Sequence, residues 1–269
     1  MPSINLMDQL DLYYIENGSG RPVIFVHGVF MSGKYFHRQV EAFGKEFHSM
    51  AIDLRGHGHS SHTDNGHTMG SYAADLRAFI KAKNLKNVVL VGWSMGCMVI
   101  WDYFKQFGKT DISATVLVDQ SPSDFKWNDW QHGVFDLQSL VTMMSNLQTD
   151  REQVFRDFIP MLFNEPPASE EVDWMLEELM LMPSTIASAV LFDQTMQDYR
   201  NIVSKVNVPT LVITGGCEGK LLPVESVKFV HEQITGSQFS IFENANHCPF
   251  LEETERFNKE VMDFIHNLN

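Results

Sequence analysis

Short apolar runs recur along the chain and alternate with segments of helical periodicity. Five runs are apolar along nearly their whole length, at residues 22–26, 50–53, 87–91, 114–119 and 210–214. Continuous rather than alternating apolar residues are typical of strands buried on both faces, as in a parallel sheet. A further strand is predicted at residues 238–242, and residues 4–16 resemble one or two antiparallel edge strands.

Amphipathic segments lie between the predicted strands. Apolar residues recur at helical spacing over residues 35–43, 72–83, 95–107, 224–234 and 253–268. Alternating strands and helices predict an α/β fold with a doubly wound, mostly parallel sheet and right-handed crossovers.

The alternation stops between residues 121 and 197. This stretch has several helical patterns, no convincing strand, and many Trp, Phe and Met residues. We therefore expect a core formed by residues 1–120 and 198–269, and a helical cap formed by residues 121–197 over the carboxyl edge of the sheet. Most of the large cap side chains should pack inside the cap, and a minority should line a pocket.

Composition narrows the classes of partner. The chain has 269 residues and a net charge of −14, so it should be repelled by the phosphates of nucleic acids. No unbroken apolar run approaches the roughly 18 residues of a membrane span, and the first ten residues do not resemble a secretory signal. Three cysteines argue against a disulfide framework. We expect a cytoplasmic protein without a membrane partner, although an export signal already removed stays open.

The strongest chemical motif is Gly92-Trp93-Ser94-Met95-Gly96, which fits G-x-S-x-G. It follows a predicted apolar strand and opens a predicted helix, which is the strand–turn–helix context that this motif requires. Such a turn presents the serine hydroxyl above the sheet edge, and the helix N-terminus favours developing negative charge. Ser94 is therefore predicted to be a catalytic nucleophile.

His27-Gly28, directly after the strand at 22–26, strengthens this interpretation. Here the chain resembles the α/β-hydrolase superfamily, especially its carboxylesterase and cofactor-free haloperoxidase branch. The resemblance implies an oxyanion hole made by the backbone amides of Val29 and Met95. For His27 itself we expect a role in bracing its loop, with no part in proton transfer.

Two further segments resemble this family. Residues 53–60 (DLRGHGHS) resemble its structural D-x-R-G-x-G-x-S loop. His59, His62 and His67 lie nearby without acidic or cysteine residues at ligand spacing, so no metal is expected. Near the chain end, Asn244-Ala245-Asn246-His247-Cys248-Pro249 resembles the context of the family's catalytic histidine, which implies that His247 is the general base.

The acid of the triad has two candidates. The family often places it in a G-x-x-D-x-x-x-P loop, and here the corresponding loop runs from Gly215 to Pro223. Counting from Gly215 selects Glu218, whereas counting back from Pro223 leaves the acid position to a glycine. Other branches place the acid after the preceding strand, where Asp119 stands. Asp119 is slightly favoured and Glu218 stays open.

The predicted reaction is hydrolysis of a small or medium apolar ester, or a related acyl compound, through an acyl-enzyme on Ser94. No cofactor is expected. The pocket should include Phe30, Trp93, Phe158 and Met161. Alternatives on the same fold are a ligand-binding signalling receptor, a carbon–carbon bond hydrolase and a cofactor-free dioxygenase. The Gly-Trp-Ser-x-Gly form also resembles pimeloyl-ester esterases, and peroxide attack on an acyl-enzyme could give haloperoxidase activity.

Overall fold

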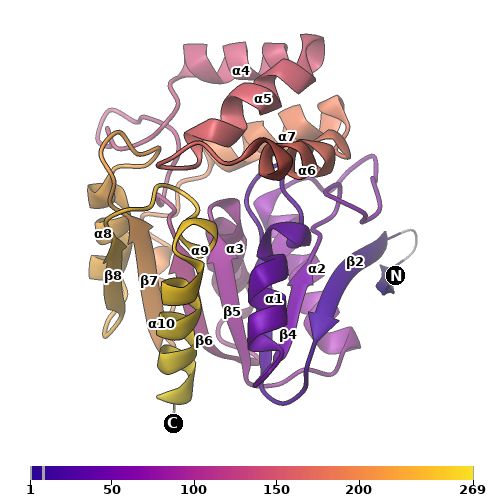
Figure 1. Cartoon of the computed structure of the whole chain (residues 1–269), viewed down its shortest axis with the longest axis vertical. Coiled ribbons are helices and arrows are strands. Elements are labelled where there is room, and N and C mark those ends of the chain that lie inside the picture. Colours follow the sequence, from indigo (N-terminus) through magenta and orange to yellow (C-terminus); the bar gives the residue numbers. More distant parts are fainter. Residues whose placement is uncertain (1, 8–9, 269) are drawn as a thin grey trace.

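A central sheet organises the computed structural model, which describes residues 2–7 and 10–268 (Figure 1). Within these residues eight strands follow the order β1-β2-β4-β3-β5-β6-β7-β8. β1 pairs with β2 and β2 with β4 in antiparallel fashion, and the remaining pairs are parallel. The predicted α/β class with a mostly parallel sheet is confirmed.

The strands lie close to their predicted positions. Their bounds are β1 Ser3–Met7, β2 Leu10–Asn17, β3 Pro22–Val26, β4 His48–Ile52, β5 Val88–Trp93, β6 Ile112–Val118, β7 Thr210–Gly215 and β8 Gln238–Phe242. The predicted edge strands at 4–16 are present as β1 and β2, while residues 8 and 9 lie outside the described part of the chain. All residues of β5 and β7 are buried, as their continuous apolar sequences predict.

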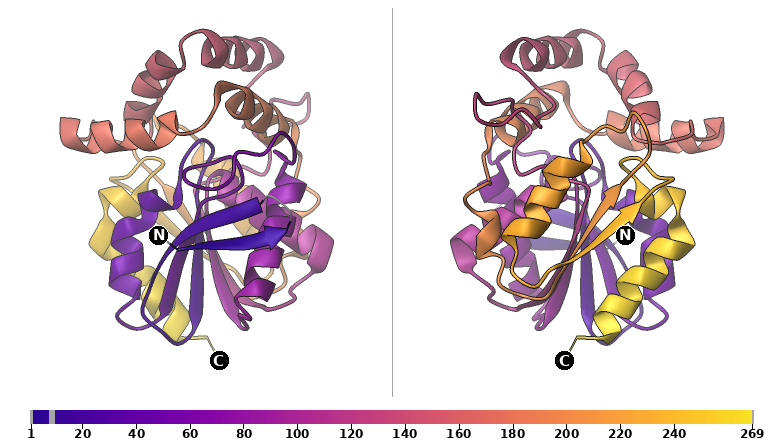
Figure 2. Two further views of the ribbon diagram at one scale, coloured as in Figure 1. Left: turned by 90° about the vertical axis from the view of Figure 1, so that its right-hand side faces the viewer. Right: turned by 90° about the vertical axis from the view of Figure 1, so that its left-hand side faces the viewer.

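Helices cover both faces of the sheet. α1 (His37–Phe43) and α10 (Thr254–His266) lie on one face, and α2 (Met69–Ala82), α3 (Met95–Phe107) and α8 (Val224–Gln233) on the other (Figure 2). Short helical turns complete the layers: η1 (Gly33–Phe36), η2 (Val203–Lys205) and α9 (Pro249–Glu252). The parallel strands thus end at one common edge, where the loops that follow them meet.

Four helices lie between β6 and β7 and sit above the carboxyl edge of the sheet (Figure 1). They are α4 (Leu137–Thr149), α5 (Arg151–Met161), α6 (Ser169–Met180) and α7 (Ser184–Met196). We call these helices and the turns between them the cap. The boundaries 121 and 197 for a separate unit stay a prediction.

No single helix among the described residues is both long enough and apolar enough to span a membrane. α6 and α7 reach that length and apolarity only when taken together, and their axes are bent by 92° relative to each other.

Candidate active site

Ser94 occupies a sharp turn between β5 and α3. Its backbone has φ 54° and ψ −127°, a region that residues with a side chain rarely adopt. Its N–H donates a hydrogen bond of 3.0 Å to the carbonyl of Val118, the last residue of the neighbouring strand β6. The fold therefore holds the hydroxyl-bearing residue in a strained conformation at the carboxyl edge of the sheet.

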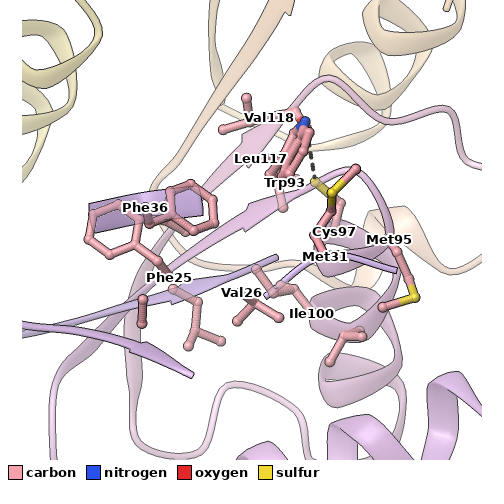
Figure 3. Packing of buried hydrophobic residues seen from close by; sticks show 14 of the residues in the cluster. Phe25, Val26, Met31, Phe36, Trp93, Met95, Cys97, Ile100, Leu117 and Val118 are labelled. Carbon is pink, nitrogen blue, oxygen red and sulfur yellow. Dashed lines mark hydrogen bonds between the residues drawn. The ribbon is translucent and has the colours of Figure 1, made fainter. Parts of the chain in front are cut away.

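The glycines on either side of Ser94 are required by close contacts. A Cβ atom on Gly96 would lie 2.1 Å from the carbonyl oxygen of Val26, and one on Gly92 would lie 2.7 Å from the backbone of Gly96. Cys97 fills the next position as a buried residue, and its thiol donates to the carbonyl of Gly92 at 3.1 Å. Figure 3 shows this side chain in the apolar cluster beneath the turn.

The loop after β3 passes beside the serine. A Cβ atom on Gly28 would lie 3.5 Å from the Oγ atom of Ser94. His27 braces this loop, because its Nε2 accepts from the N–H of Leu54 at 3.0 Å and its Nδ1 lies 2.8 Å from the carbonyl of Gly28. Phe30 lies in this loop with φ 67°, so its backbone, like that of Ser94, has a positive φ that residues with a side chain rarely adopt.

Two backbone N–H groups at this point have no hydrogen-bond acceptor in the described part of the chain. Within the described residues, no backbone hydrogen bond is donated by the N–H of Val29. Met95 is the first residue of α3, a position whose N–H has no acceptor inside the helix. Both amides are therefore available to an oxygen beside Ser94.

His247 contacts Asp119. The Nδ1 atom of the imidazole lies 2.7 Å from Oδ2 of Asp119, and both side chains are buried. Oδ1 of Asp119 accepts from the Thr214 hydroxyl at 2.7 Å and from the Gly215 N–H at 3.1 Å. The carboxylate is thus held by the Thr214 and Gly215 donors on one oxygen and by the imidazole on the other.

Lys220 places a cation behind this pair. Its Nζ atom lies 2.9 Å from Oδ1 of Asp119 and also donates to the Thr214 hydroxyl and the Gly215 carbonyl. Burial alone would raise the pKa of Asp119, but the hydrogen bond from His247 and the charge of Lys220 outweigh it and hold that pKa below its usual value. Asp119 is therefore a carboxylate at neutral pH.

Glu218 lies in the same loop as Lys220 but is exposed. It borders a shallow surface hollow together with Asn164 and Asn246, and makes no hydrogen bond to His247 within the described residues. Of the two candidate acids, only Asp119 is brought to the imidazole.

The backbone around His247 is tied to the segment that follows α5. The N–H of His247 donates to the carbonyl of Leu162 at 3.0 Å, and the side-chain amide of Asn246 donates to the carbonyls of Met161 and Phe163. The side-chain amide of Asn164 donates to the carbonyl of Asn244. The loop that carries the imidazole is therefore held by the cap as well as by the core.

A cavity of about 310 Å³ opens onto Ser94 and His247. The remaining lining residues come from the loops after β3, β6 and β7 and from the cap: Val29, Phe30, Gln120, Asp124, Val134, Phe135, Met143, Asn146, Val154, Asp157, Phe158, Met161, Leu191, Gln194, Leu221 and Leu222. Most of these side chains are apolar. The cavity is thus suited to an apolar group bound beside the serine.

Three of the four predicted pocket residues line this cavity. Phe30 and Phe158 face each other with ring centroids 6.2 Å apart, and Met161 is 55% exposed at the rim. Trp93 is not among the residues that line the cavity. Its indole N–H donates to the carbonyl of His247 at 2.7 Å, and its ring packs against Phe250.

Comparison with known proteins gives the family. A family model described as alpha/beta hydrolase fold matches residues 21–254. This chain belongs to the α/β hydrolase family. The resemblance that the motifs indicated is confirmed.

Relatives of this α/β hydrolase include enzymes with different names. This chain is 27% identical over 271 residues to a putative non-heme chloroperoxidase of Synechocystis, and the match covers 95% of each chain. It is 25% identical over 260 residues to a pimeloyl-[acyl-carrier protein] methyl ester esterase of Vibrio cholerae, covering 94% of this chain and 97% of the relative. Its fold matches an esterase from Exiguobacterium antarcticum with a TM-score of 0.93 and 24% identity, over 98% of this chain and 99% of the other.

The cavity of this hydrolase contains polar residues that sequence reasoning missed. Gln120, Asp124 and Gln194 form one hydrogen-bonded group in its wall. No motif marks them, because Gln194 comes from α7 and the other two from the loop after β6. Lys220 also has no sequence signal, because an isolated lysine in a loop is usually exposed, whereas here the loop turns it toward Asp119.

The histidines at 59–67 do not converge on one point. His59 lies beside Asp53, and His67 lies 2.7 Å from the carbonyl of Thr63. Across residues 2–7 and 10–268, no group of three or more His, Cys, Asp or Glu side chains has the arrangement of a metal site.

Proposed function

We propose that this α/β hydrolase is a serine esterase that cleaves small to medium apolar carboxylic esters. The observation that carries the proposal is the contact of Asp119 with Nδ1 of His247, in a cavity that Ser94 and His247 both line. A carboxylate on Nδ1 holds the tautomer in which Nε2 can accept a proton. The apolar lining of the cavity supports an apolar substrate.

In the proposed mechanism, Nε2 of His247 takes the proton of Ser94 as its oxygen attacks the ester carbonyl. The N–H groups of Val29 and Met95 stabilise the resulting oxyanion. Collapse of the tetrahedral intermediate breaks the ester bond, and His247 gives its proton to the departing alcohol. Water, deprotonated by His247, then attacks the acyl-enzyme and releases the acid and free Ser94. Asp119 orients the imidazole and stabilises its charged form throughout.

Steady hydrolysis of nitrophenyl esters of graded acyl length tests this function. We expect multiple turnovers with a preference for an acyl chain that fills the cavity, and no need for an added metal or cofactor. A single turnover, accompanied by a ligand-induced rise in melting temperature, would instead support a signalling receptor. Absence of ester cleavage with cleavage of a carbon–carbon bond in a β-diketone would also overturn the esterase proposal.

Lys220 should set the pH range of activity. Replacing Lys220 by Met removes a cation beside Asp119, so the carboxylate stabilises protonated His247 more strongly. The base must be neutral to act, so the acid limb of kcat/KM should move to higher pH, by about half to one unit. The measurement is the pH profile of ester hydrolysis.

Lys228→Met is the matched control for this prediction. Lys228 lies on the surface of α8, and its one ion pair among the described residues is with Glu232 at 3.7 Å. The pH profile of the Lys228→Met variant should overlay that of the wild type. If the Lys220→Met profile overlays it too, Lys220 does not act on the proposed base.

A further inference from the structure

A polar group interrupts the otherwise apolar wall of the cavity. Asp124 is only 3% exposed, yet it borders the same cavity as Ser94 and His247. Its Oδ1 accepts from the amide of Gln120 at 2.7 Å, and its Oδ2 accepts from the amide of Gln194 at 2.6 Å. The carboxyl group is therefore held in a fixed orientation by two side-chain amides.

Asp124 has no cationic partner within 4.0 Å among the described residues. Burial raises the pKa of Asp124 to about 6, although the two amide donors and the nearby His247 act to lower it. At neutral pH the group is thus mainly a buried carboxylate that only neutral donors solvate. Such a group costs free energy unless it gains further hydrogen bonds.

The side chains of Gln120, Asp124 and Gln194 together have more hydrogen-bond acceptor positions than donors. Each carboxylate oxygen of Asp124 accepts one hydrogen bond from a side chain and can accept another. The Oε1 atom of Gln194 is buried and has no partner in the described part of the chain. A group that served only to brace α7 against the loop after β6 would need neither the charge nor the unused acceptor, because a neutral side chain could link the same elements.

We propose that Asp124 and Gln194 form a specificity site for a hydrogen-bond donor, a hydroxyl or an ammonium group, carried by the ester substrate. The inference rests on the proposed esterase function and refines its substrate class: an ester that is apolar along most of its length and bears one donor away from the carbonyl. The donor binds between the free acceptor positions of Asp124 and Gln194 while the ester carbonyl lies at Ser94. An ester without the donor leaves these acceptors unpaired.

Matched esters test this specificity site. The substrates are nitrophenyl alkanoates of increasing length, each with counterparts that carry a terminal hydroxyl or a terminal ammonium group. The readout is the ratio of kcat/KM for the donor-bearing ester to that for the plain ester of equal length. At the optimal length we expect the wild-type ratio to exceed that of Asp124→Asn by about tenfold to a hundredfold, since hydrogen bonds to charged groups are of this strength.

Comparing variants by this ratio cancels intrinsic ester reactivity and any loss of folded enzyme. Asp173→Asn is the control, because Asp173 is an exposed aspartate of cap helix α6 and is not among the residues that line the cavity. Its ratio should stay within about twofold to threefold of the wild type. Gln194→Met is a second variant of similar side-chain length. It removes both the free acceptor and one of the two amides that orient Asp124, and its ratio should also fall.

The outcomes separate the inference from the function on which it rests. A hydroxyl preference identifies a neutral donor, and an ammonium preference identifies a cation; either supports the site if it is lost in Asp124→Asn. Equal rates on plain and donor-bearing esters, or a preference that survives in both variants, overturns it. If no ester is hydrolysed, the esterase proposal fails alone. Binding then decides the inference: alkane diols and amino alcohols should raise the melting temperature of the wild type more than matched alkanols, and Asp124→Asn should lose this difference.

Discussion

Replacement of Ser94 by alanine should lower kcat for ester hydrolysis by a factor of about 10⁴–10⁶. The change removes the only atom that can form the proposed acyl-enzyme and leaves the cavity and the two candidate oxyanion amides in place. A fluorophosphonate probe, which reacts with an activated serine, should label the wild type and fail to label the variant. The variant should stay folded, because the substitution removes only the Oγ atom and alanine can occupy the same backbone.

Ser113→Ala provides the control for this experiment. Ser113 lies in β6, where its hydroxyl donates to the backbone carbonyls of Asn87 and Val88 at the other end of the sheet. This variant should keep its turnover and its labelling. Full ester turnover by Ser94→Ala would show that the reaction does not pass through this serine.

Asp119→Asn should lower kcat by about 10³–10⁴, whereas Glu218→Gln should lower it less than about tenfold. An amide at position 119 cannot stabilise the protonated imidazole, and its NH2 group favours the wrong tautomer of His247. The exposed Glu218 makes no hydrogen bond to that ring in the part of the chain that the structure describes. The two kcat values, measured with the same ester, give the comparison.

Lys220 complicates Asp119→Asn, because the variant leaves a buried cation without its carboxylate. Removing one member of a buried ion pair lowers the free energy of unfolding by about 3–5 kcal/mol, because the other charge stays buried without a partner. The double variant Asp119→Asn/Lys220→Met should therefore regain melting temperature without regaining activity, which separates loss of chemistry from loss of fold. Strong impairment by Glu218→Gln with an active Asp119→Asn would assign the acid to the loop after β7.

The strands and the turn at Ser94 could be predicted from the sequence because each depends on local residue order. Apolar runs such as 22–26 and 210–214 have few other stable environments than a sheet buried on both sides. Gly92 and Gly96 reveal the turn, since only glycine fits where its strand, helix and neighbouring loop approach one another.

The choice between the two candidate acids and the polar cavity wall depend instead on how distant segments meet. Asp119 and Glu218 are both plausible by their distance along the chain, and only the direction of the loop from Gly215 to Pro223 separates them. That loop turns Lys220 inward and Glu218 outward. Asp124 and Gln194 are separated by 70 residues and meet because α7 returns to the core. Nothing in the local sequence of either residue encodes that contact.

The hydrogen bonds between the His247 loop and residues 161–164 limit how freely the cap could be exchanged between related enzymes. An inserted segment suggests a module that protein engineers could replace to change substrate range. Here the Leu162 carbonyl holds the backbone of His247, and the carbonyls of Met161 and Phe163 hold Asn246. A chimera joined on either side of all four helices would replace the backbone segment that positions these carbonyls, together with the old pocket. Grafts that retain residues 161–164 as a fixed hinge for the imidazole should therefore keep far more activity than grafts of the whole cap.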